Sequence, residues 1–77
     1  MIKIENLIPL LKEGWVAMDE NEVWCWFEEE PHRESSINGG YWQSNASVII
    51  TNYCLQDIAP VKDWTQSLIK IERKYNE

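Results

Sequence analysis

The side chains that could perform acid–base, nucleophilic or metal chemistry are few and scattered. His32 is the only histidine, and it lies in the polar segment 31–40, PHRESSINGG. Its polar neighbours in this segment are Glu34, Ser35 and Ser36. A catalytic triad requires a fixed geometry that adjacency in a loop does not supply, and a metal site requires further ligands. The glycine pair that closes the segment is typical of a turn and not of a phosphate-binding loop. The sequence therefore predicts no enzymatic activity, no metal and no cofactor.

The cysteines and the apolar runs indicate an intracellular protein. Cys25 and Cys54 do not form a C-x-x-C pair, so zinc and redox motifs are absent. The longest apolar runs, such as 8–11 and 48–50, fall far short of the ~20 residues of a membrane span. No apolar stretch of signal-peptide length follows the N-terminus. We expect a cytoplasmic protein with no membrane contact, in which both thiols are reduced and packed as small apolar groups.

Negative charge is concentrated in one part of the chain. The 77 residues include 13 acidic and 7 basic side chains, for a net charge of −6. Residues 13–34 contain eight acidic side chains and one basic side chain, Arg33, for a local charge of −7. This segment is either a solvated hairpin edge that keeps a small protein soluble or a surface that binds a basic protein. Because binding to a polyanion depends on lysine and arginine, we do not expect direct contact with nucleic acid.

The second interpretation assigns the negative charge of a binding surface to five glutamates: Glu20, Glu22, Glu28, Glu29 and Glu30. On a continuous strand, Glu28 and Glu30 would share a face about 6.6 Å apart, since each residue rises ~3.3 Å. That separation is similar to the spacing of successive phosphates along a nucleic-acid strand. Such a row of carboxylates would fit the groove of a nucleic-acid-binding protein.

Five tryptophans supply the largest apolar side chains of the sequence. Alternation along a strand places Trp24 and Trp26 on one face, where Trp42 joins them if the strands are neighbours. These rings either pack in the core or form a platform that stacks on a ligand or a partner. In a binding surface, Trp24 or Trp26 would be the apolar anchor. Trp15 and Trp64 are expected to be core residues that join helix and sheet.

The chemistry-bearing residues must be positioned by a small α+β domain that includes the whole chain, residues 1–77. The spacing of apolar residues predicts a helix over 4–13 that stops at Gly14. Strands are expected at 15–19 and 23–29, joined as a hairpin by the polar turn 19–22, and both faces of the second strand are apolar. Residues 31–40 are expected to form a loop. Further strands are expected at 41–43 and 47–53, followed by irregular chain at 54–59. Together these elements form an antiparallel sheet of three to four strands.

The C-terminal segment fits two kinds of secondary structure. Its apolar residues recur at intervals of three or four, which favours a helix that begins after Pro60. These residues are Val61, Trp64, Leu68, Ile71 and Tyr75. The alternative is an extended segment, because residues 68–71 also fit the pattern of a strand. The sequence thus predicts one helix at each end of the chain.

Two stretches resemble small uncharacterised proteins encoded by phages and prophages. They are residues 14–19, GWVAMD, and residues 60–68, PVKDWTQSL, and together they span less than half of the chain. The resemblance implies an accessory protein of a phage or mobile element, located in the cytoplasm of a bacterial host cell. It transfers no catalytic motif and no functional residue.

We therefore expect a non-enzymatic interaction protein that binds a basic protein surface. In a phage setting, that partner would be a nucleic-acid-binding defence or regulatory protein of the host, which this chain would inhibit. Two alternatives remain: an oligomer that holds a small ligand such as a nucleotide on its aromatic face, and a structural component of the phage. The sequence also leaves dimerisation open.

Overall fold

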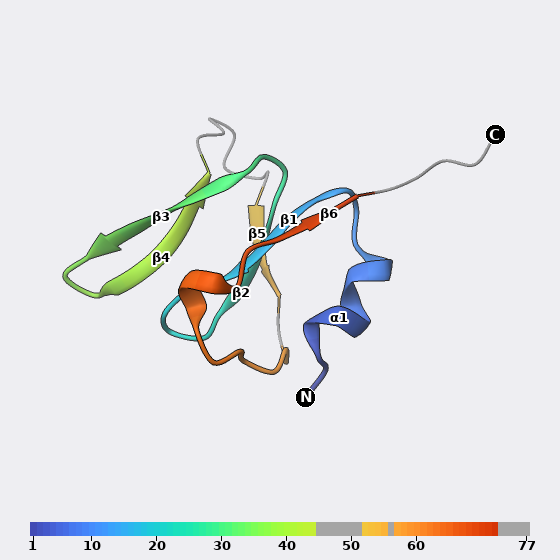
Figure 1. The fold of residues 1–77 in the computed structure, drawn as a ribbon, viewed down its shortest axis with the longest axis horizontal. Coiled ribbons are helices and arrows are strands. Elements are labelled where there is room, and N and C mark those ends of the chain that lie inside the picture. The colour runs from blue at the N-terminus through green and yellow to red at the C-terminus, as the bar shows by residue number, and fades with distance from the viewer. Residues whose placement is uncertain (45–51, 56, 73–77) are drawn as a thin grey trace.

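The computed structural model describes residues 1–44, 52–55 and 57–72, with the side chains of 52–54 outside the description. In these ranges the protein consists of short helical segments and six strands (Figure 1). The helical segments are α1 (Ile4–Leu7), η1 (Ile8–Leu10) and η3 (Trp64–Gln66). The strands are β1 (Gly14–Met18), β2 (Trp24–Phe27), β3 (Pro31–Ser36), β4 (Gly39–Ser44), β5 (Asn52–Leu55) and β6 (Ile69–Ile71). A four-stranded sheet has the order β5-β2-β1-β6, and β3 and β4 form a separate two-stranded sheet.

The N-terminal helix is confirmed, but it is shorter than the sequence indicated. The α-helical part ends at Leu7, and the chain continues as a 3₁₀ turn that contains Pro9. Proline has no backbone N–H with which to continue the α-helical hydrogen-bond pattern. The amide of Leu11 instead donates to the carbonyl of Ile8 at 3.0 Å, which closes the tighter turn.

The predicted β1–β2 hairpin is confirmed. Trp15 lies opposite Phe27 and Met18 lies opposite Trp24 in an antiparallel ladder. The turn is closed by the amide of Asp19, which donates to the carbonyl of Val23 at 2.9 Å. β2 is shorter than the expected 23–29, and it is buried over its whole length because both faces of the sheet are covered.

The predicted C-terminal helix is wrong within the described residues. Residues 64–66 form a single 3₁₀ turn, and the side chain of Asp63 caps it by accepting a hydrogen bond from the amide of Thr65. β6 then pairs antiparallel with β1, as the extended alternative for residues 68–71 implied. Ile71 is buried and Lys70 is exposed, so the period of two fits this segment once a strand edge is available. Pairing also satisfies backbone groups of β1 that a helix would have left open.

The predicted loop over residues 31–40 is also wrong. Its first six residues form β3, which pairs with β4 through a turn at Ile37 and Asn38. Most of β3 is exposed, so its polar composition reflects a solvated ribbon and not an irregular chain. Gly39 follows the turn with a φ of 116°, a conformation that disfavours other residues. Figure 1 shows this hairpin extending from the four-stranded sheet on the side away from α1.

The fourth predicted strand is described only in part. Residues 47–51, which are most of the predicted strand, lie outside the described residues. The described part of this region, β5, pairs with β2 and continues to Leu55, within the segment expected to be irregular. The antiparallel arrangement is confirmed, but the strands form two sheets and not one.

Two apolar clusters cover the two faces of the four-stranded sheet. One consists of side chains from the N-terminal segment, Ile58 and one face of the strands: Ile4, Leu11, Val16, Met18, Trp24, Trp26, Ile58 and Ile71. The other contains Ala17, Cys25, Phe27 and Trp42, with Trp15 and Leu68 packed against it. Trp64 contacts both clusters. The sheet therefore has no open apolar face in the described part of the chain.

Candidate protein-interaction surface

The predicted acidic surface is divided between the two ends of the β1–β2 hairpin. Glu20 and Glu22 lie in the turn next to Met18, whereas residues 28–30 follow Phe27 at the far end of β2. All five glutamates are exposed. β2 ends at Phe27, so Glu28 and Glu30 do not share a strand face, and the expected row of carboxylates at strand spacing is corrected.

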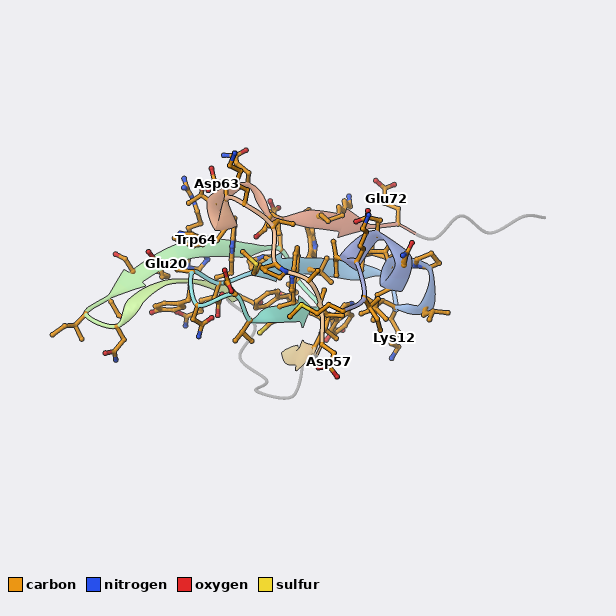
Figure 2. All side chains as sticks on the ribbon, turned by 90° about the horizontal axis from the view of Figure 1, so that it is seen from below. Lys12, Glu20, Asp57, Asp63, Trp64 and Glu72 are labelled. Atoms are coloured by element: carbon orange, nitrogen blue, oxygen red, sulfur yellow. The ribbon has the colours of Figure 1, made fainter. Side chains whose placement is uncertain are left out.

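The strand register places Glu13, Glu28 and Glu72 at one end of the sheet, and Glu29 and Glu30 follow Glu28 in the link to β3. β1 begins where β2 and β6 end, because Trp15 lies opposite Phe27 and Gly14 lies opposite Ile71. Residues that flank these strand ends therefore lie at the same end of the sheet. We call this region the acidic end and define it by five exposed residues: Glu13, Glu28, Glu29, Glu30 and Glu72. Figure 2 shows Glu72 on the opposite side of the molecule from Glu20.

Two members of the acidic end were not identified as site residues from the sequence. Glu13 was counted in the acidic segment but not assigned to a surface, and Glu72 is far from that segment along the chain. Only the antiparallel pairing of β6 with β1 brings Glu72 to this end. The sequence signal for Glu72 is the strand pattern of residues 68–71. A strand there that pairs with β1 in the observed register places Glu72 at the acidic end.

No lysine or arginine neutralises the acidic end within the residues that the structure describes. In that part of the chain the only ion pair joins His32 and Glu34, whose Nε2 and Oε2 atoms are 2.7 Å apart. Lys70 lies 5.5 Å from the centroid of the Trp15 ring and forms no ion pair with a described acidic side chain. The carboxylates of the acidic end are therefore exposed and form no ion pair with any side chain in the described ranges.

The opposite end of the hairpin has a structural role. Glu20 accepts a hydrogen bond from the amide of Gly40 at 2.7 Å, and its own amide donates to the Gly40 carbonyl at 3.0 Å. Asp19 accepts from the amide of Trp42 at 2.8 Å. Burial raises the pKa of Asp19, while the bond from Trp42 opposes that shift. These contacts attach the β3–β4 hairpin to the turn of the β1–β2 hairpin, so Glu20 contributes to the packing of the two hairpins.

The tryptophans of β2 belong to the core. Trp24 and Trp26 are 1% and 6% exposed, respectively. Their indole N–H groups donate to the carbonyls of Ala59 and Lys12, both at 3.1 Å. These rings leave almost no surface for an apolar anchor, which agrees with the core-packing alternative.

Trp42 does not join Trp24 and Trp26 on one face, because it packs in the cluster on the other side of the sheet. The alternative of an aromatic platform formed by all three rings is therefore wrong. Trp42 instead meets Trp64 edge to face, with ring centroids 6.2 Å apart and planes at 82°. Trp64, labelled in Figure 2, joins η3 to the β3–β4 hairpin.

The candidate chemical groups of the β3–β4 hairpin make local contacts. Ser36 donates to the carbonyl of Gly39 and accepts from the amide of Asn38, which shapes the turn. His32 and Glu34 form an exposed pair. In the part of the chain that the structure covers, no three histidine, cysteine, aspartate or glutamate side chains are grouped to hold a metal ion.

A shallow hollow lies beside the N-terminal helix. It is lined by Lys3, Ile4, Glu5, Ala59, Pro60 and Val61. None of these residues is aromatic, so this hollow is not the aromatic ligand site that the sequence left open.

Within the described ranges, no helix has the length and apolar character needed to cross a bilayer. No protein-family model matches the chain, and no curated protein or solved structure shows significant similarity to it.

Proposed function

We propose that this chain is a non-enzymatic interaction protein whose acidic end binds a basic surface of another protein. The observation that carries the proposal is the gathering of Glu13, residues 28–30 and Glu72 at one exposed end without a lysine or arginine partner in the described residues. A cluster of like charges destabilises a compact chain through self-repulsion. A basic partner would relieve that repulsion.

Electrostatic complementarity also favours this function over direct contact with nucleic acid. A cluster of carboxylates attracts a basic protein over several ångströms and raises the association rate. It repels a polyanion, because phosphate binding requires lysine and arginine. The proposed partner is a nucleic-acid-binding protein, whose basic groove the acidic end would occupy. In the phage setting that residues 14–19 and 60–68 imply, the partner would be a host defence or regulatory protein, and binding would inhibit it.

Charge reversal at the acidic end tests this proposal. The variant Glu28→Lys, Glu29→Lys, Glu30→Lys is compared with a matched variant in which the net charge changes by the same amount but at other positions. The matched variant carries Glu5→Lys, Glu22→Lys and Glu34→Lys, which are exposed and lie outside the acidic end. Each protein is immobilised, bound proteins from a bacterial lysate are identified, and the purified partner is then measured by surface plasmon resonance at several salt concentrations.

We expect the association rate of the unmodified chain to fall steeply as salt rises, because long-range attraction is screened. The acidic-end variant should associate at least about tenfold more slowly at low salt and should lose the salt dependence. The matched variant should retain most of both. Equal binding by the unmodified chain and the acidic-end variant would refute the proposed surface.

Inhibition is measured separately. The purified partner is mixed with labelled nucleic acid, and the unmodified chain should displace the nucleic acid whereas the acidic-end variant should not. A ternary complex of all three components would show that the acidic end does not occupy the nucleic-acid groove.

A further inference from the structure

The two cysteines, which the proposed function does not use, meet at one rung of the sheet. Cys25 in β2 is the register partner of Cys54 in β5. Residues 26–53 separate them along the chain, and neither lies in a sequence motif that indicates a pair. Cys25 is buried, and β5 is the edge strand of the sheet next to β2.

The hydrogen-bond pattern of the sheet defines what kind of pair these cysteines form. Residues directly opposite in an antiparallel ladder alternate between hydrogen-bonded and non-hydrogen-bonded pairs. The amide of Asp19 donates across the hairpin to Val23, whereas the amide of Met18 points to the β6 side and donates to Ser67. The direction of the backbone N–H and C=O groups alternates along a strand. Those of Ala17 therefore point toward β2, where its partner is Cys25.

The backbone groups of Cys25 therefore face β1 and point away from β5. In the β2–β5 ladder, Cys25 and Cys54 must then form a non-hydrogen-bonded pair. Opposite residues of this type have Cα atoms about 4.5 Å apart, closer than in the hydrogen-bonded type. Disulfides form at Cα separations of roughly 4.4 to 6.8 Å, so the backbone needs little movement to allow the bond.

We propose that Cys25 and Cys54 form a reversible cross-strand disulfide when the chain meets a disulfide oxidant such as oxidised glutathione. One cysteine thiolate attacks the glutathione disulfide, forms a mixed disulfide and releases one glutathione thiolate. The other cysteine thiolate then attacks the protein sulfur of the mixed disulfide and releases the second glutathione. The two protein thiols lose two electrons and two protons, and oxidised glutathione is reduced to two glutathione thiols.

The bond would close a covalent ring that contains residues 28–30 and the whole β3–β4 hairpin. It would also attach the edge strand β5 to β2, which lies in the middle of the core. A cross-link of this span stabilises the fold mainly because it restricts the unfolded chain. The redox state would then determine how firmly the part of the chain that carries residues 28–30 is held.

The test compares disulfide formation in the folded chain and in urea. The purified full chain is equilibrated with mixtures of oxidised and reduced glutathione, remaining thiols are alkylated, and peptides are identified by mass spectrometry. We expect a peptide pair linked through Cys25 and Cys54 that is lost after treatment with dithiothreitol. The folded chain should form this link at a glutathione ratio at least about a hundredfold less oxidising than the urea-unfolded chain requires, as chain entropy for a ring of this size implies.

Single variants provide the controls. Cys25→Ala and Cys54→Ala should each form only a mixed disulfide with glutathione, and oxidation should raise the urea midpoint of the unmodified chain but not that of either variant. The peptide measurement on the unmodified chain stands even if a variant fails to fold. Mixed disulfides without the linked peptide, links only between chains, or equal formation in urea and in native buffer would each overturn the proposal.

Discussion

Replacing Gly40 with alanine should destabilise the protein through a single packing conflict. A Cβ atom at Gly40 would overlap Cζ2 and Cη2 of Trp64 and would lie 3.1 Å from Cε2 of the same ring. Gly40 is not among the glycines with positive φ, so the cost comes from this contact and not from backbone conformation. The Trp64 ring cannot move away freely, because it packs edge to face on Trp42. The backbone carbonyl of Trp64 also accepts a hydrogen bond from the Trp42 indole N–H at 3.2 Å.

The expected loss of stability is about 1–3 kcal/mol, the usual cost of an extra methyl group in a packed region. For a chain of this length, each kcal/mol lowers the melting temperature by roughly 4–8 °C. Urea and thermal unfolding followed by tryptophan fluorescence and circular dichroism measure the change. Ser35→Ala is the matched control, since Ser35 is exposed and lies opposite Gly40 in β3. It should stay within about 0.5 kcal/mol of the unmodified chain.

A double variant distinguishes the packing conflict from general damage to the hairpin. Phenylalanine at position 64 lacks the distant ring atoms that alanine at position 40 would overlap. Gly40→Ala combined with Trp64→Phe should therefore cost less than the sum of the two single changes, by about 0.5–3 kcal/mol. Unchanged stability of Gly40→Ala, or strict additivity in the double variant, would refute the proposed conflict.

Two further changes test the contacts that attach the β3–β4 hairpin and the segment before β6 to the β1–β2 hairpin. Burial raises the folded-state pKa of Asp19, so the stability linked to its protonation is present below the unfolded pKa and is lost as pH rises through the folded pKa. Asp19→Asn retains an acceptor for the Trp42 amide, and urea titrations should show a smaller loss of stability between acidic and neutral pH; an unchanged pH profile would contradict this assignment. Ser67 is 3% exposed and accepts the Met18 amide at 2.8 Å, so Ser67→Ala should cost about 1–3 kcal/mol by leaving that amide without an acceptor. A urea midpoint equal to that of the unmodified chain would show that another group replaces the hydroxyl.

Local sequence determined the parts of the fold whose partners are close along the chain. The β1–β2 hairpin followed from two apolar runs and the polar turn at residues 19–22, and the pairing of the two strands was confirmed, with Ala17 opposite Cys25. The N-terminal helix followed from the spacing of apolar side chains, although Pro9 converted its second turn to 3₁₀ geometry. These elements form through short-range contacts, which composition and spacing describe well.

Tertiary pairing determined the elements whose sequences fit more than one conformation. Residues 69–71 satisfy a helical and a strand period, and the open edge of β1 selected the strand. Residues 31–36 are polar because their ribbon is solvated, a context that composition cannot distinguish from a loop. The rings of Trp24 and Trp42 lie on opposite faces because β4 belongs to a second sheet.

The candidate surface shows the same division. The sequence by itself determined a net charge of −6 and the exposed run at residues 28–30, since glutamates are rarely buried without a partner. It did not determine that Glu20 would bond Gly40, nor that Glu72 would reach the acidic end, because each placement depends on segments far apart in the chain. Composition sets the amount of charge, whereas strand order and register set where that charge gathers.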